Sequence, residues 1–168
     1  MEMAGAVALV TGGNGGLGQR ICHALAKEGV HVAVMYAQSR DEAERVARDL
    51  VSRHQINAAA FQCDITDGAA VERLIGDVTR RFGRIDILVN DAAYNKSIPF
   101  ADLDGLTMAV WDQIIAVNLT GPMRLTKAVA PVMKAQGRGR IVNIASVAGA
   151  GRPARRSPMR CQRRGSFT

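Results

Sequence analysis

The sequence has few of the residues that build metal centres and disulfide frameworks. Its three cysteines and three histidines are scattered over 168 residues, and their spacing matches neither kind of site. We therefore expect no metal ion. We expect Cys22 and Cys63 to be small residues of the core, as buried free cysteines usually are.

Long apolar runs are also missing. No stretch approaches the roughly eighteen apolar residues of a membrane span. Residues 1–5 have no basic region ahead of an apolar one, which a secretory leader would need. These two absences predict no membrane association and a cytoplasmic protein.

Acidic residues are absent from residues 151–168, which hold six arginines. The whole chain has a net charge of +7, so residues 1–150 account for only +1. Phe167 is the one aromatic residue of this segment, too few for stacking on bases. We expect a basic, disordered tail over 151–168 that binds polyanions weakly at most, and no specific nucleic-acid partner.

Residues 1–150 instead alternate between short apolar runs and amphipathic stretches, which predicts one domain. Apolar runs of strand length occupy residues 6–10, 32–35, 58–61, 85–89 and 141–145, with helical periodicity between them. This alternation predicts a parallel sheet with helices on both faces, a doubly wound α/β (Rossmann-like) fold. The periodicity stops after Ser146, so we expect the fold to be incomplete after its fifth strand.

Helix boundaries carry their own signals. Ser39 to Glu42 spells a capping box that predicts a helix start, and Asp67 has the side chain of an N-cap. Gly29 and Gly83 follow amphipathic stretches and predict helix ends.

Five glycines crowd into the nine residues "VTGGNGGLG", between the first predicted strand and helix. The general dinucleotide fingerprint G-x-G-x-x-G fits from Gly13, and the spelling T-G-x-x-x-G-x-G fits from Thr11. Either way, glycine lets the backbone approach a pyrophosphate, and the helix N-terminus favours the anion. The alternative is a tight turn without a ligand.

The end of the second strand bears on the cofactor. An NAD-preferring enzyme places an acid there for the ribose 2′-hydroxyl, and this sequence has Tyr36. Ser39 and Arg40 follow, a hydroxyl and a cation that suit a 2′-phosphate. NADP(H) is therefore more strongly indicated than NAD(H), although Ser39 could be only a cap and Arg40 only a solvated charge.

Four further pieces occur in one order along the chain. They are Cys63-Asp64-Ile65, Asn90-Asp91-Ala92-Ala93, Asn118, and the run from Ile141 to Ser146. With the glycine stretch, they make residues 6–150 resemble the short-chain dehydrogenase/reductase family, in particular its 3-oxoacyl reductases. The resemblance selects the T-G-x-x-x-G-x-G spelling.

In that spelling the structural glycines are Gly12, Gly16 and Gly18, and Asn14 and Leu17 lie near the phosphates. The family's roles for the remaining residues follow by position. Asp64 and Ile65 hold the adenine, Asn90 lines the cofactor, Ser146 binds the substrate oxygen, and Asn118 holds a water of the proton relay.

The fourth-strand motif departs from the family's Asn-Asn-Ala-Gly at Asp91 and Ala93. Ala93 narrows the room beside the cofactor slightly. The resemblance implies hydride transfer between nicotinamide and a small-molecule carbonyl or secondary alcohol, in a protein that is usually a homo-oligomer.

The family's Tyr-x-x-x-Lys motif occurs nowhere in the sequence. Met159 and Arg163 stand at the positions expected from Ser146, and neither Tyr36 nor Tyr94 has a lysine four residues later. One permitted choice of codons restores the motif in another frame, so we hypothesise a truncation or frameshift near residue 158 that also removes part of the family's dimer interface. A non-catalytic NADP-binding fragment or pseudoenzyme is the alternative interpretation.

Overall fold

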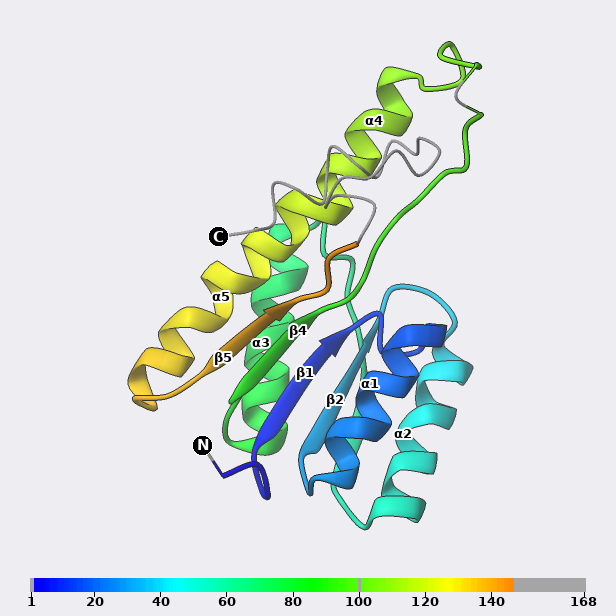
Figure 1. Cartoon of the computed structure of the whole chain (residues 1–168). Coiled ribbons are helices and arrows are strands. Elements are labelled where there is room, and N and C mark those ends of the chain that lie inside the picture. Colours follow the sequence, from blue (N-terminus) through cyan, green and yellow to red (C-terminus); the bar gives the residue numbers. More distant parts are fainter. Residues whose placement is uncertain (1, 100, 147–168) are drawn as a thin grey trace.

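The computed structural model describes residues 2–99 and 101–146. Strands and helices alternate along the chain, as the apolar pattern predicts (Figure 1). The strands are β1 (Val7–Thr11), β2 (His31–Tyr36), β3 (Ala58–Gln62), β4 (Ile87–Asn90) and β5 (Arg140–Asn143). The helices are α1 (Gly16–Lys27), α2 (Arg40–His54), α3 (Gly68–Phe82), α4 (Met108–Ile115) and α5 (Gly121–Ala135), with a π-helical segment η1 (Ala116–Thr120) between α4 and α5. The tail predicted over 151–168, with Met159 and Arg163, lies outside the described residues.

The five strands form one parallel sheet in the order β3-β2-β1-β4-β5. The chain runs outward from β1 through β2 to β3, then crosses to the other side of β1 for β4 and β5. This reversal leaves a crevice at the carboxyl ends of β1 and β4, where doubly wound sheets bind their ligands. The predicted fold class is confirmed.

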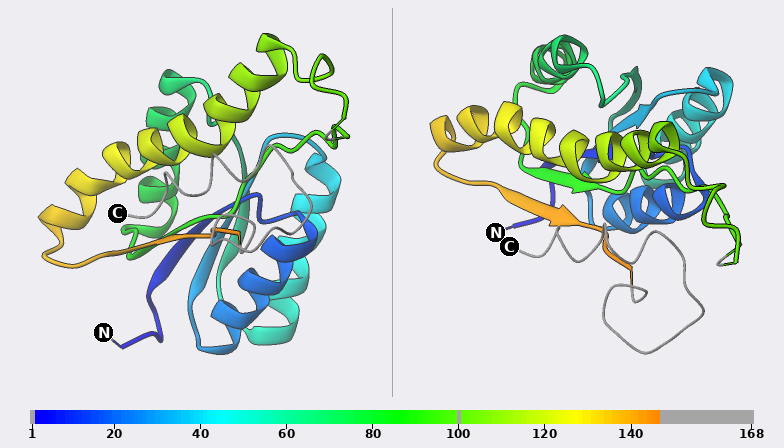
Figure 2. Two further views of the ribbon diagram at one scale, coloured as in Figure 1. Left: turned by 45° about the horizontal axis from the view of Figure 1, so that its top comes forward. Right: turned by 90° about the horizontal axis from the view of Figure 1, so that it is seen from above.

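Helices cover both faces of the sheet (Figure 2). On one face α1 and α2 pack through small and branched side chains, among them Cys22, Ala43, Val46 and Leu50. On the other face α3 and α5 pack through Leu74, Val78, Leu125 and Val129. Since β1 lies between the two layers, all five of its residues are buried, which explains its unbroken apolar run.

The predicted boundaries of α3 are confirmed, whereas the predicted capping box of α2 is not. Asp67 caps α3 by accepting a hydrogen bond from the backbone N–H of Ala69 at 2.9 Å, and Gly83 ends that helix at a φ of 79°. The capping box at the start of α2 is wrong. Ser39 precedes the helix in a left-handed conformation (φ 62°, ψ 63°), and its side chain makes no capping hydrogen bond.

The amino edge of the sheet is held by the buried carboxylate of Asp86. Its Oδ2 accepts hydrogen bonds from the N–H of Val7 at 2.9 Å and from Arg84 at 2.7 Å, and its Oδ1 accepts from Arg138 at 3.0 Å. Burial by itself would raise the pKa of Asp86, but these hydrogen bonds outweigh it and lower the pKa. The cluster ties the start of β1 to the segments that precede β4 and β5.

Strand β5 pairs with β4 alone among the strands described. Ile141 and Val142 are 38% and 44% exposed, so the sheet has an apolar edge at this point. Within the described part of the chain, no helix combines the length and the apolar character needed to span a membrane.

Candidate functional site

The glycine turn is closed by contacts between its own backbone atoms. Gly12 adopts a φ of +65°, which favours glycine, and its carbonyl oxygen accepts a hydrogen bond from the N–H of Gly15 at 2.9 Å. A Cβ on Gly18 would overlap that same oxygen. Gly12 and Gly18 are therefore required by the turn itself.

Of Gly13 and Gly16, the structure leaves room for a side chain only at Gly16. A Cβ on Gly13, which the T-G-x-x-x-G-x-G spelling leaves free, would lie 2.9 Å from Cγ1 of Val34. Among the residues that the structure describes, a Cβ on Gly16 would meet nothing within 4 Å. Packing among the described residues therefore does not require glycine at 16, and the bare backbone there faces open space.

That open space lies at the N-terminus of α1. The first N–H groups of a helix have no acceptor within the helix, and Gly15 at the N-cap has no side chain to satisfy them. No acidic side chain lies in the first turn. The backbone N–H groups and the helix dipole are consequently suited to an anion such as a pyrophosphate.

Thr11 joins the glycine turn to the end of β4. Its hydroxyl oxygen accepts hydrogen bonds from the N–H groups of Asp91 at 3.0 Å and Ala92 at 2.9 Å. The side chain is almost fully buried. The sequence alone indicates no role for Thr11 beyond its place in the glycine motif. Its position at the carboxyl end of a central strand is the signal that could have identified this link.

A chain of hydrogen bonds connects the same turn to the loop between β2 and α2. The side chain of Asn14 donates to the carbonyl of Gln38 at 3.0 Å, and Gln19 donates to the carbonyl of Asn14 at 2.8 Å. Gln19 also donates to Glu42 at 2.8 Å, and Arg45 binds the same carboxylate. The pKa of Glu42 falls to about 2, chiefly through the hydrogen bond from Arg45. Glu42 thus holds α1 and α2 together instead of completing a capping box.

The two residues expected at a 2′-phosphate differ in their surroundings. Ser39 lines the large pocket described below. Arg40 does not, and its Nε donates to Glu44 at 2.7 Å from a side chain that is 74% exposed. The guanidinium lies at the surface beside the loop, within the first turn of α2.

Asp64 shapes the loop that follows β3. Its Oδ1 accepts hydrogen bonds from the backbone N–H and the hydroxyl of Thr66, at 2.8 and 2.7 Å, and these bonds lower the pKa of Asp64. The side chain of Arg124 in α5 donates to the carbonyl of Thr66. Ile65 packs where a side chain on Gly121 would stand, since a Cβ there would lie 2.7 Å from Cδ1 of Ile65. The loop is thereby fixed against the start of α5.

These loops surround a pocket of about 500 Å³ at the carboxyl edge of the sheet. It brings together five of the predicted site residues, namely Gly12, Asn14, Ser39, Asp64 and Ile65. Sequence analysis missed several others that line it, among them Met35, Gln38, Tyr94 and Gln113. Tyr94 and Gln113 come from the long loop and from α4, whose position no local pattern reveals.

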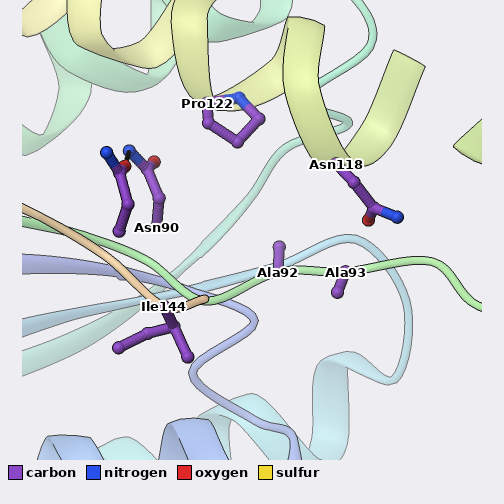
Figure 3. Close-up of a pocket in the computed structure, with 7 residues that line it drawn as sticks. Asn90, Ala92, Ala93, Asn118, Pro122 and Ile144 are labelled. Atoms are coloured by element: carbon purple, nitrogen blue, oxygen red, sulfur yellow. Dashed lines mark hydrogen bonds between the residues drawn. The ribbon is translucent and has the colours of Figure 1, made fainter. Parts of the chain in front are cut away.

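A smaller pocket lies between η1 and the ends of β4 and β5, and it is lined by Asn90 and Asn118 (Figure 3). Asn118 is buried in the π-helical segment, an irregularity often found at functional sites. Its Oδ1 accepts from the N–H of Tyr94, and its Nδ2 donates to the carbonyl of Tyr94, both at 2.8 Å. Asn118 therefore fixes the backbone of the loop after β4.

The remaining predicted residues line neither pocket. Leu17 is 53% exposed at the N-terminus of α1. Ser146 is half-buried and follows the last residue of β5 by three positions, on the same edge of the sheet as the pockets.

The two described cysteines confirm the expectation that they are core residues, because both are buried. Burial raises the pKa of the Cys22 thiol to about 12 and that of Cys63 to about 11, with nearby carboxylates adding to each effect. Neither thiol is poised as a nucleophile at neutral pH.

The chain is similar in sequence to known proteins. Residues 6–158 match the family model described as short chain dehydrogenase. A 3-oxoacyl-[acyl-carrier-protein] reductase of Staphylococcus epidermidis is 37% identical over 147 residues, which cover 85% of this chain and 57% of that protein. The chain thus spans little more than half the length of this relative.

Solved structures show the same arrangement. An NAD+-bound xylitol dehydrogenase superposes with a TM-score of 0.85 at 30% identity, covering 97% of this chain and 61% of the other. A metagenomic short-chain oxidoreductase in complex with NADP superposes with a TM-score of 0.86 at 32% identity, covering 98% and 73%.

Proposed function

The chain belongs to the short-chain dehydrogenase family, and from that premise we propose that it binds a nicotinamide dinucleotide, NADP(H) in preference to NAD(H), for hydride transfer involving a carbonyl or secondary alcohol. The observation that carries the proposal is the open space beside Gly16. No described residue would clash with a side chain at this position, so packing does not explain why it is glycine. A ligand that approaches the helix N-terminus would clash with a side chain there and would explain the glycine.

The residues around the large pocket fit such a cofactor. The pyrophosphate would meet the N–H groups at Gly16 and Leu17. The adenine would lie beside Asp64 and Ile65, in a loop held by hydrogen bonds to Thr66. The 500 Å³ pocket lies next to the helix N-terminus and is lined by Gly12 of the turn as well as by Asp64. When bound, the nicotinamide supplies or accepts the hydride.

Other residues would act on the substrate side. The hydroxyl of Ser146 would hold the substrate oxygen at the carboxyl edge of the sheet. Asn90 would lie along the cofactor at the end of β4. Asn118 would hold a water of the proton relay, and its two hydrogen bonds to Tyr94 would keep the loop after β4 in place.

The preference for NADP(H) rests on the loop after β2. Tyr36 ends the strand where an acid would bind a ribose 2′-hydroxyl, and Ser39 and Arg40 offer a hydroxyl and a cation to a 2′-phosphate. The solved relatives include one bound to NADP and one bound to NAD+, so family membership leaves both cofactors open.

The names of relatives suggest a substrate class. We propose a 3-oxoacyl thioester or a related ketone, since the relative from Staphylococcus epidermidis is named a 3-oxoacyl-[acyl-carrier-protein] reductase. A homo-oligomer is proposed on the same basis of family membership.

A second candidate is a non-catalytic NADP-binding chain, favoured by the absence of Tyr-x-x-x-Lys from the sequence. Losing a general acid lowers a rate by roughly 10² to 10⁴-fold. The test is NADPH binding by fluorescence titration, followed by NADPH oxidation with a 3-oxoacyl thioester and with a simple ketone. Binding with turnover supports the first candidate, and binding without turnover of either substrate supports the second. Absence of binding would overturn both.

A further inference from the structure

The smaller pocket is large enough to hold a single water molecule. Its volume is about 20 Å³, and a cavity needs roughly 10–15 Å³ of such volume to hold one water. It is lined by Asn90, Ala92, Ala93, Asn118, Pro122, Asn143 and Ile144. Figure 3 shows Asn90, Ala92 and Asn118 around it, with Pro122 above them.

Asn90 contributes to this pocket an acceptor that no described residue pairs. The residue is 5% exposed, and its Nδ2 donates to Oδ1 of Asn143 at 2.9 Å. Its Oδ1 is buried and has no hydrogen-bond partner among the described residues. A buried acceptor without a donor is costly, because folding removes the water that satisfies it in the unfolded chain.

The lining distinguishes this pocket from a dry cavity. Genuinely empty cavities are apolar, whereas three amide side chains from β4, η1 and β5 line this one. A buried water needs two to four polar partners. The chain therefore offers a volume, an unpaired acceptor and further amides at one point.

We propose that one ordered water occupies this pocket, donates a hydrogen bond to Oδ1 of Asn90 and takes a second partner from the amide of Asn143. The water joins the end of β4 to the end of β5. It belongs to the folded chain itself and does not depend on the proposed cofactor, so loss of NADPH binding in other variants leaves it unaffected.

Replacement of Asn90 by leucine, which has a similar shape, should change the unfolding equilibrium constant differently if the pocket holds water than if it is dry. If water satisfies Asn90, Asn90→Leu loses that hydrogen bond and the one to Asn143, and the unfolding equilibrium constant rises about tenfold or more. If the pocket is dry, Asn90→Leu still loses the hydrogen bond to Asn143, but removal of the unsatisfied acceptor offsets this loss, and the constant stays unchanged or falls.

Thr79 provides the matched control. Its hydroxyl is also buried and without a hydrogen-bond partner in the described chain, and it lines neither of the two pockets. Thr79→Val should therefore leave the unfolding equilibrium constant unchanged or lower it. Urea denaturation of the full chain measures all three proteins.

A crystal structure of the unchanged chain decides the matter even if Asn90→Leu does not fold. Ordered density within hydrogen-bonding distance of Oδ1 of Asn90 is the expected result. An empty pocket, at a resolution where other buried waters are visible, would overturn the proposal, as would an Asn90→Leu variant at least as stable as the original protein.

Discussion

The carbonyl oxygen of Gly12 occupies the space that a β-carbon on Gly18 would need. The first helical turn of α1 can therefore fold back on the end of β1 only when residue 18 is glycine. Gly16 lies two residues away, and no described residue would contact a side chain there. One motif thus contains glycines that the fold requires and a glycine that packing within the described chain does not explain.

This contrast predicts different failures for two valine substitutions. Gly16→Val should leave helical content unchanged and weaken NADPH binding at least 100-fold, because the side chain fills the proposed phosphate position. Gly18→Val should destabilise or unfold the protein, since the clash is with backbone. Circular dichroism and NADPH titration measure both. Undiminished NADPH affinity in Gly16→Val would show that the phosphate binds elsewhere.

Arg40 allows a test of the preference for NADP(H). Arg40→Ala should weaken NADPH binding about fivefold and leave NADH binding unchanged, a modest effect for an exposed cation that loses one charge-assisted contact. Arg48→Ala is the matched control, because Arg48 is similarly exposed and pairs with the same Glu44. Equal effects of the two variants on NADPH affinity would remove Arg40 from the site.

Asp86 should make stability depend on pH in the acid range. Its pKa is lowered in the folded protein, so its contribution is complete above its ordinary pKa near 4. That contribution is lost as the pH falls through the lowered value. Asp86→Asn should cost about 3 kcal/mol at pH 7, the low end for breaking a buried ion pair because both arginines are partly exposed.

Urea unfolding at pH 7 and at pH 3 checks this expectation. The original protein should lose stability between these values, and Asp86→Asn should lose less. A variant with the same pH dependence as the original would show that other carboxylates are responsible.

The buried thiols should be unreactive in the folded protein. In a Cys161→Ser background, which removes the cysteine outside the described residues, Cys22 and Cys63 should react with a disulfide reagent at pH 8 only after unfolding. Their thiolate fractions at that pH are about 10⁻⁴ and 10⁻³, from pKa values of about 12 and 11. Absorbance of the released thiol, with and without urea, gives the rates. Rapid labelling of the folded protein would contradict the burial of these residues.

Apolar periodicity was sufficient to predict the fold because it reports which faces are buried. It could not predict the π-helical segment, since the spacing from Trp111 to Met133 reads as one continuous helix. The capping-box signal misassigned Ser39, which precedes α2 in a left-handed conformation. The neighbouring Gln38 accepts a hydrogen bond from Asn14, a residue distant in sequence.

The candidate site was predictable only where a motif is contiguous. Gly12, Asn14, Asp64 and Ile65 lie in short recognisable runs, and the structure brings them to one pocket. Tyr94 reaches the same pocket because Asn118, twenty-four residues later, holds its backbone. No feature of the local sequence carries that information.

The Asp86 cluster and the glycine turn lie at opposite ends of β1. Changes to one end should therefore leave the other intact, and their effects on free energy should add when combined. The loops at the carboxyl edge could then be exchanged to alter cofactor preference while substitutions at the amino edge independently restore lost stability. The sheet thus separates the loops at the carboxyl edge, which can be redesigned, from the Asp86 cluster at the amino edge, which stabilises the fold.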